Sequence, residues 1–301
     1  MTLTISFYFL TILVIILGFI IGKKLSKYLE KKLLSKNMDN LIGRLKLLEK
    51  KNNSKILFIV DNYIRYSNYK LEKYFFDLNI DSIDYFIDWI SNNNKKFSTL
   101  QIIIHTNGGY LDVSDLIFVI LLNYKGQINI YIPYYAFSAG TFIALCGDKI
   151  FMNYYSVMGP VDPQIGFDKK INHNYPANTL INLYKLKKKS NKLTNENIIN
   201  ILEGKKLYFD NINNLKRLFE SKKFSKKQIS KIIRELSSGK NPHCKPFTSN
   251  MLMDLGIKIY QMPDEINELF DLFKKIRNKI DNKFIILFYK IMNSNINGEH
   301  L

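Results

Sequence analysis

The sequence has few of the residues from which disulfide frameworks and metal sites are built. Its 301 residues include two cysteines, Cys146 and Cys244, which form no C-x-x-C pair. Two isolated cysteines exclude a disulfide-stapled fold and give no metal-ligand spacing, so we expect no metal site. Cys146 falls in an apolar segment and is expected to be buried. This cysteine usage is compatible with a reducing compartment.

Phosphate-binding signatures are missing, and acidic residues are scarce. Neither G-x-x-x-x-G-K-[ST] nor G-x-G-x-x-G occurs, so a nucleotide is not expected, and no other cofactor is indicated. The chain has 26 Asp and Glu against 44 Lys and Arg, a formal net charge of +18. This excess of basic residues is compatible with binding to nucleic acid or to an anionic membrane surface. Because no arginine-rich run or aromatic-interleaved basic motif accompanies it, nucleic acid is not expected as a partner.

One long hydrophobic run is present near the N-terminus. Leu3 to Ile21 has Thr4, Ser6 and Thr11 as essentially its polar members, and it is long enough to cross a hydrocarbon core of about 30 Å. Lysines flank the run only on its C-terminal side, at positions 23, 24, 27, 31, 32 and 36. We therefore predict an uncleaved, single-pass membrane anchor with everything after it in the cytoplasm.

The rest of the chain alternates between strand-like and helix-like patterns, which predicts an α/β domain. Strands are expected at 56–60, 100–104, 128–132 and 149–152, and helices between them at 81–90, 113–122 and 138–146. Further helices are expected at 197–202, 207–219, 229–236 and 248–256, then a strand at 257–259 and a last helix after Pro263. We divide the chain into an anchor (1–22), a charged helical stalk (23–55), the α/β domain (56–275) and a C-terminal helix or tail (276–301).

Two turns in this pattern carry residues suited to chemistry. Ser138 comes soon after the strand that Pro133 ends, at the start of an uncharged helix whose positive N-terminus favours an oxyanion. The alternative is that Ser138 only caps the helix, because serine is among the commonest N-cap residues. Likewise, Gly108 and Gly109 follow a strand and precede a helix, so their N–H groups can approach a ligand closely; the alternative is a tight turn.

Three segments together resemble one protease family. They are His105-Thr-Asn-Gly-Gly109, Tyr135-Ala-Phe-Ser-Ala-Gly-Thr141 and Met158-Gly-Pro-Val-Asp-Pro-Gln164, of which the last is the most specific. They resemble the serine dehydrogenase proteinase family, Clp-fold serine proteases related to signal peptide peptidase A, over roughly residues 100–259. The family has proline where this chain has Asn107 and methionine where it has Phe137. The resemblance implies a Clp/crotonase-like α/β fold of repeated strand-helix units with a helical C-terminal part.

The resemblance also implies roles for individual residues. Ser138 becomes the nucleophile, with Gly108, Gly109 and the amide of Ala139 stabilising a tetrahedral oxyanion. The proteolytic Clp subunit has a histidine about two dozen residues after its serine, but this chain has Asp162 there and no histidine before His173. A serine–lysine dyad, as in signal peptide peptidase A, fits the chain better. Matching the segment after Tyr175-Pro-Ala177 to the family implies Lys187 as the base, with Lys185 and Lys188 within a turn of error. His243 is the alternative base, and Asp162 is a residue that can orient one.

We therefore predict a membrane-anchored serine endopeptidase that acts on peptide or protein substrates and assembles into a homo-oligomer. A catalytically inactive Clp-fold scaffold or binding subunit at the membrane is the alternative, because the base is not fixed by the sequence. An acyl-CoA enzyme of crotonase architecture is disfavoured, since that chemistry does not need a serine at this turn.

Overall fold

The computed structural model describes residues 36–61, 75–76, 83–93, 99–168, 171–187 and 194–281, together with positions 22, 24, 25, 28, 32, 33 and 78. These residues divide into two compact units. Leu48–Asn267 form the larger unit, and the described residues before and after them form the smaller one. The smaller unit contains most of α10 (Asp264–Asp281) and most of a helix over residues 36–51, in the segment predicted to be partly helical.

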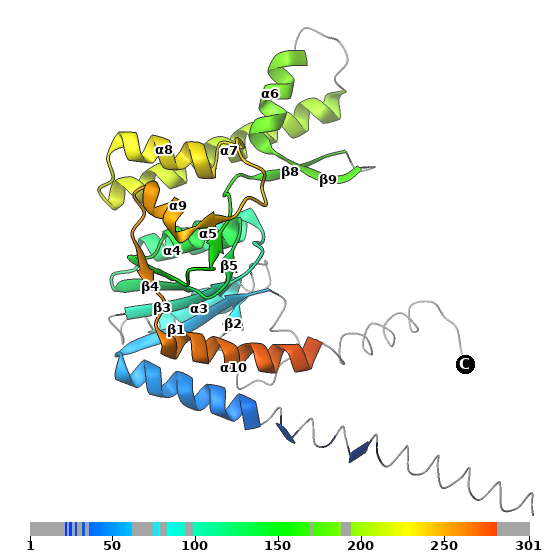
Figure 1. Ribbon diagram of the computed structural model, residues 1–301. Coiled ribbons are helices and arrows are strands. Elements are labelled where there is room, and N and C mark those ends of the chain that lie inside the picture. The colour runs from blue at the N-terminus through cyan, green and yellow to red at the C-terminus, as the bar shows by residue number, and fades with distance from the viewer. Residues whose placement is uncertain are drawn as a thin grey trace, which may run out of the picture. The chain divides into compact units, whose positions relative to one another are not determined.

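A six-stranded parallel sheet is the centre of the larger unit (Figure 1). Its strand order is β11-β6-β4-β3-β1-β2, that is Ile259–Gln261, Lys149–Met152, Gln127–Ile132, Thr99–His105, Ser54–Val60 and Phe75–Phe76. The inner strands are rich in isoleucine because a parallel sheet is buried on both faces. The five predicted strands are confirmed to within two residues at either end, with β11 shifted by two residues from the predicted 257–259, whereas β2 was not predicted.

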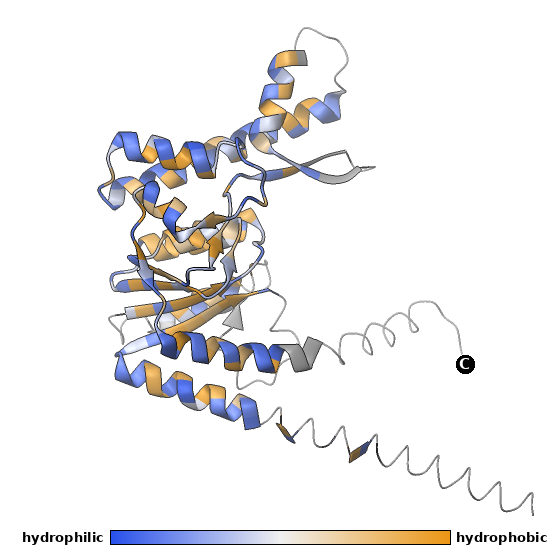
Figure 2. Ribbon diagram, in the orientation of Figure 1, coloured by the Kyte–Doolittle hydropathy of each residue, from blue (hydrophilic) through white to orange (hydrophobic). Residues whose placement is uncertain are grey.

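Three helices join consecutive parallel strands, as the alternating pattern predicted. They are α3 (Ile83–Asn93), α4 (Leu111–Leu122) and α5 (Ala139–Leu145). Alternate strand residues such as Ile104 and Ile130 share a core with Phe118 of α4 and Phe142 of α5. Every residue of α5 is buried, and within the part of the chain that the structure describes, the strands of the large sheet and the helices α4 and α5 are rich in hydrophobic residues (Figure 2). The core therefore fixes the strand ends from which the functional turns emerge.

A second, smaller sheet was not predicted. It consists of β5 (Tyr135–Ala136), β7 (Val157–Met158) and β10 (Phe247–Thr248). β5 and β7 are parallel, with Ala136 beside Met158, and β10 runs antiparallel to β7, with Phe247 beside Met158. Strands of two residues leave no periodic signal in a sequence, so this sheet is visible only in three dimensions.

The segment after β7 forms an arm that projects from the two sheets (Figure 1). The arm consists of the hairpin β8 (Gln164–Asp168) and β9 (Ile171–Pro176), α6 (Ala177–Lys187) and the first half of α7 (Asn195–Ser221). The prediction of two separate helices at 197–202 and 207–219 is wrong, because α7 is continuous. Gly204 does not end the helix; a Cβ there would lie 2.6 Å from Ile165 Cδ1, so Gly204 allows α7 to pack closely on β8.

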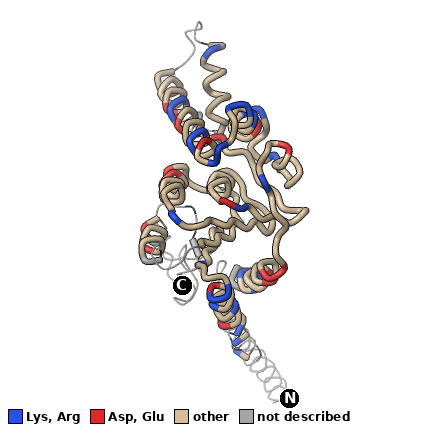
Figure 3. The backbone as a smooth tube through the Cα atoms, turned by 90° about the vertical axis from the view of Figure 1, so that its left-hand side faces the viewer, with Lys and Arg blue, Asp and Glu red and all other residues tan. Residues whose placement is uncertain are grey.

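Two further helices complete the larger unit. α8 (Lys226–Leu236) begins with a capping box made by Ser225 and Gln228. α9 (Ser249–Asp254) is capped by Thr248 and followed by Gly256 at a φ of 89°, so the predicted capped helix and glycine stop are confirmed. Lys and Arg lie along the helices with Asp and Glu among them (Figure 3).

The predicted anchor, Leu3 to Ile21, and the apolar tail at 284–292 lie outside the described residues. Among the helices that the structure does describe, none combines the length and the hydrophobicity needed to cross a bilayer.

Candidate active site

Ser138 has an unusual backbone conformation directly after β5. Its φ is 50° and its ψ is −119°, outside the regions that residues with a Cβ normally occupy. It occupies the N-cap position of α5, but its side chain makes no capping hydrogen bond. The interpretation of Ser138 as a simple helix cap therefore loses its physical basis. Ser138 as a whole is half-buried.

The turn from His105 to Gly109, called the oxyanion turn below, lies against Ser138. Gly108 has a φ of 122°. A Cβ added to Gly108 would lie 2.8 Å from Ser138 Cβ and 3.4 Å from Ser138 Oγ. A Cβ added to Gly109 would lie 2.2 Å from the carbonyl oxygen of Leu78. Both glycines are therefore required by close approach, and Gly108 presents bare backbone to the serine side chain.

The hydrogen bonds of the oxyanion turn separate the two glycine amides. Gly108 N–H already donates to Thr106 Oγ1 at 3.1 Å. Within the described residues, the N–H groups of Gly109 and Ala139 have no hydrogen-bond acceptor. Of the predicted oxyanion donors, Gly109 and Ala139 are thus available to a ligand beside Ser138, while Gly108 supplies the open space.

A second polar group forms around Asp162. Its carboxylate is buried, with 2% of the side chain exposed, and Oδ1 lies 2.8 Å from Nδ1 of His243. Gln164 Nε2 donates to Asp162 Oδ2 at 2.9 Å. Gln164 Nε2 also lies 3.1 Å from His243 Nδ1. In the tautomer that carries its proton on Nδ1, the ring donates to Asp162 and Nε2 is a proton acceptor. The structure thus pairs Asp162 with His243, a contact that the sequence left open.

The small sheet brings this pair to the same end as the serine. β5 leads directly into Phe137 and Ser138, and its parallel neighbour β7 leads into the segment with Asp162. β10 is antiparallel, so the chain that enters it, with His243, approaches from that same end. Ser138, Asp162 and His243 thus emerge from adjacent ends of one sheet although they are far apart in sequence.

The predicted base Lys187 is the last residue of α6, and its side chain lies outside what the structure describes. α6 belongs to the arm, and its carboxyl end points away from the two sheets (Figure 1). Lys185, one of the neighbouring alternatives, is exposed, and Lys188 falls outside the described residues. The assignment of Lys187 as the base stays a prediction.

Other residues singled out in the sequence have structural positions. His105 ends β3, and its ring packs 4.2 Å from the ring of Tyr135. Burial raises the pKa of the Cys146 thiol to about 12, so this cysteine stays protonated.

The carboxylate of Asp61, which the sequence did not indicate, accepts hydrogen bonds from the oxyanion turn. Asp61 can be placed beside this turn only from the β1–β3 register, in which Val60 pairs with His105.

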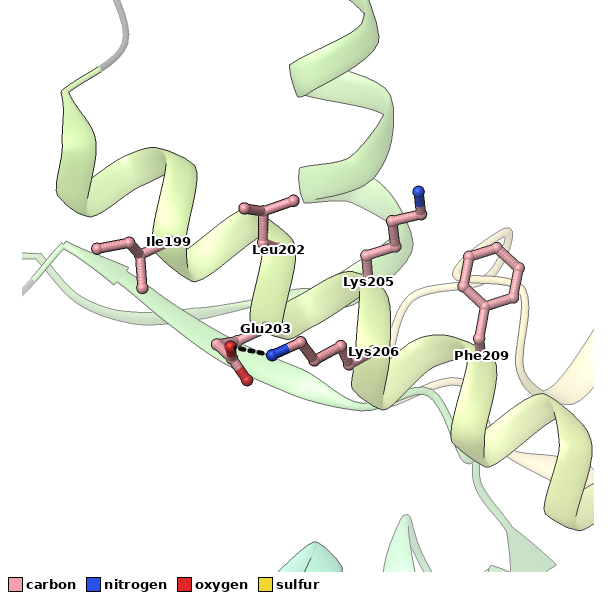
Figure 4. A pocket seen from close by; sticks show the side chains of 6 residues that line it. All are labelled: Ile199, Leu202, Glu203, Lys205, Lys206 and Phe209. Carbon is pink, nitrogen blue, oxygen red and sulfur yellow. Dashed lines mark hydrogen bonds and ion pairs between the residues drawn. The ribbon is translucent and has the colours of Figure 1, made fainter.

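A surface hollow of about 420 Å³ lies on the arm and not at Ser138 (Figure 4). It is lined by Ile199, Leu202, Glu203, Lys205, Lys206 and Phe209. Lys206 bonds to Glu203 in this hollow at 2.7 Å. None of the candidate catalytic residues lines it, so we treat it as a feature of the arm surface.

Comparison with known proteins gives one family and several relatives. The family model described as "ClpP-like SDH-type serine proteinase" matches residues 1–298. The uncharacterised protein MJ1495 of Methanocaldococcus jannaschii is 34% identical over 175 residues, which make up 58% of this chain and 56% of the relative. The chain thus spans little more than half of that relative's length.

The solved structures that match the chain are more distant in sequence. A variant of the 1510-N membrane-bound stomatin-specific protease is 17% identical with a TM-score of 0.41, covering 71% of this chain and 84% of its own. ClpP1 from Listeria monocytogenes is 16% identical with a TM-score of 0.42, covering 72% of this chain and 98% of its own.

Proposed function

Because the chain belongs to the ClpP-like SDH-type serine proteinase family, we propose that it is a membrane-anchored serine endopeptidase with Ser138 as its nucleophile. The conformation of Ser138 carries this proposal. Its backbone is strained, its hydroxyl does not cap the helix, and the bare backbone of Gly108 lies against it. Backbone strain of this kind costs on the order of 1–3 kcal/mol and persists where function requires it.

The surrounding amides support acyl transfer. As Ser138 Oγ attacks a peptide carbonyl, the carbonyl oxygen becomes an anion that needs fixed donors. The N–H groups of Gly109 and Ala139, which have no hydrogen-bond acceptor within the described residues, are the donors that we assign to this anion. One such donor typically contributes about 10²–10³ in rate. The acyl-enzyme is then hydrolysed by water through the same tetrahedral geometry.

We assign the general base to His243, with Asp162 as its orienting carboxylate. In this role His243 Nε2 takes the proton from Ser138 Oγ and returns it to the leaving amine, while Asp162 holds the ring through Nδ1. The 2.8 Å contact between the buried Asp162 and the partly exposed His243 supports this choice, as does the arrangement of β5, β7 and β10. A Ser138–Lys187 dyad, favoured by the sequence alone, is the alternative.

Labelling with a fluorophosphonate probe tests both assignments on the full-length chain in detergent. We expect label on the wild-type protein, none on Ser138→Ala, little on His243→Ala and normal labelling on Lys187→Met. Lys185→Met serves as a matched control on the same helix. If Lys187→Met abolishes labelling and His243→Ala does not, the base is the lysine. An unlabelled wild-type protein that also cleaves no peptide would favour an inactive Clp-fold scaffold.

The membrane anchor is part of this proposal. Leu3 to Ile21 crosses the bilayer, and the lysines after it keep the catalytic unit in the cytoplasm, next to anionic head groups. Protease added outside sealed, right-side-out vesicles should leave that unit intact. Digestion of the catalytic unit by this protease would show that the unit lies on the outer side of the membrane.

A further inference from the structure

The carboxylate of Asp61 makes three hydrogen bonds to the oxyanion turn. Asp61 is the first residue after β1, and the parallel β1–β3 register places it beside Thr106. Oδ2 accepts from the backbone N–H of Asn107 at 2.8 Å and from Asn107 Nδ2 at 3.1 Å. Oδ1 accepts from the hydroxyl of Thr106. One side chain from a neighbouring strand thus holds two consecutive residues of the turn.

These bonds continue to the glycines. Because the Thr106 hydroxyl gives its proton to Asp61, its oxygen is free to accept, and it receives the N–H of Gly108 at 3.1 Å. That bond occupies the Gly108 N–H. The next amide, Gly109 N–H, has no hydrogen-bond acceptor within the described residues. The orientation of the oxyanion donor is therefore set through a chain that begins at Asp61.

Asn107 has two donors for this contact. A proline at this position would fix φ through its ring but would have no N–H. Here the backbone N–H and the side-chain amide of Asn107 both bond to Asp61. An acceptor on the adjacent strand thereby supplies the rigidity that the Asn107 backbone itself lacks.

We propose that Asp61 is a positioning residue for catalysis, which holds the oxyanion turn so that Gly109 N–H meets the developing oxyanion at Ser138. This inference rests on the proposed function. Asp61 contacts neither the substrate nor the reacting atoms. Its removal leaves the nucleophile and the base in place and misplaces one donor, and displacement of a catalytic group by about 1 Å can cost on the order of 10²-fold.

The test compares Asp61→Ala with Asp148→Ala in the full-length chain. Asp148 is a matched control, because its carboxylate also accepts a strand N–H, that of Ile128 at 2.8 Å, but at the opposite end of the parallel sheet. We expect Asp61→Ala to lower the labelling rate and kcat about 10- to 100-fold with little change in KM, and Asp61→Asn, which keeps one acceptor oxygen, to lose less. Asp148→Ala should keep wild-type rates. Equal rates in the two alanine variants would overturn the proposal.

Hydrogen exchange separates this proposal from the proposed function. In Asp61→Ala the amide of Asn107 should exchange at least tenfold faster, whereas in Asp148→Ala the faster amide should be that of Ile128. Unchanged exchange at Asn107 overturns the role of Asp61 whatever the activity. If the wild-type chain takes up no label, the proposed function is wrong. Faster exchange at Asn107 in Asp61→Ala would still show that Asp61 fixes the conformation of the turn.

Discussion

Gly108 shows how closely the backbone of the oxyanion turn approaches the nucleophile. Its φ of 122° and the 2.8 Å separation between an added Cβ and Ser138 Cβ both require glycine. We expect Gly108→Ala to reduce labelling of Ser138 by more than tenfold and to lower the free energy of unfolding by about 1–3 kcal/mol, because both the backbone and the serine must shift.

Gly43→Ala is the control for that substitution. Gly43 is exposed in the helix over residues 36–51, and nothing lies within 4 Å of an added Cβ. Alanine there should raise stability by up to about 1 kcal/mol and leave labelling unchanged. Chemical denaturation of both variants, read with the same probe, makes the comparison. Normal labelling of Gly108→Ala would show that the turn does not face the serine as described.

At the residue scale, the sequence predicted what is local. Ser138, Gly108 and Gly109 stand at strand-to-helix turns, and such turns follow from the spacing of apolar residues alone. Asp61 was missed because its partners follow β3 whereas Asp61 follows β1, and only the β1–β3 register brings them together. Asp162 and His243 were each noticed, but their pairing depends on a contact between residues 81 positions apart.

At the element scale, long strands and helices were predicted better than short ones. The six-residue strand β4 and the twelve-residue helix α4 have enough apolar residues to show their period. The two-residue strands β5, β7 and β10 do not. Yet these short strands bring the segments that contain Ser138, Asp162 and His243 to one end of the small sheet, so the proposed site depends on the elements that the sequence reveals least.

The contact between α4 and α7 predicts a pH effect on stability. Burial, and then the charge of Asp210, raise the pKa of Asp115 from 3.8 to about 6; Asn214 Nδ2 donates to Asp115 Oδ1 at 3.3 Å. A raised carboxyl pKa means that the folded state holds the proton more tightly than the unfolded state. Stability from this group is therefore complete below about pH 4 and is lost as the pH rises towards 6 and beyond.

Asp115→Asn should remove the loss of folding stability that the wild type shows as the pH rises. At pH 7 we expect the variant to be more stable than the wild type by on the order of 1 kcal/mol, since solvent screening reduces the full effect of the shift. Near pH 4 the difference should shrink towards zero. Asp88→Asn, an exposed position on α3, should shift stability equally at both pH values. Urea denaturation at pH 4, 5, 6 and 7 measures the free energy of unfolding of both variants and the wild type. If Asp115→Asn gained the same stability at every pH, the pH effect would not come from Asp115.

At the scale of the whole molecule, the arm exposes large apolar side chains on α6 and α7. Leu186 is 83% exposed, Ile199 58%, Leu202 47% and Phe209 49%. Three of these four residues lie on α7, where Ile199, Leu202 and Phe209 line the hollow together with Glu203 and Lys206, which carry opposite charges (Figure 4). A patch of this kind on a projecting element suits a second copy of the same chain, because an isologous contact covers the patch on both copies and pairs its charges across the axis.

We therefore predict that the full-length chain in mild detergent sediments as a homo-oligomer and that the arm forms part of the contact. The double variant Leu202→Asp, Phe209→Asp should sediment as a single chain, because it places unpaired charges in the apolar patch. Met253→Asp, at a comparable 46% exposure on α9, controls for a charge added elsewhere. Thermal unfolding separates loss of assembly from loss of fold, because both positions are exposed and the variant should stay folded. If the double variant assembles like the wild type, the contact between copies does not involve the arm. If the wild-type chain is monomeric at micromolar concentrations yet fully active, assembly is not required for activity.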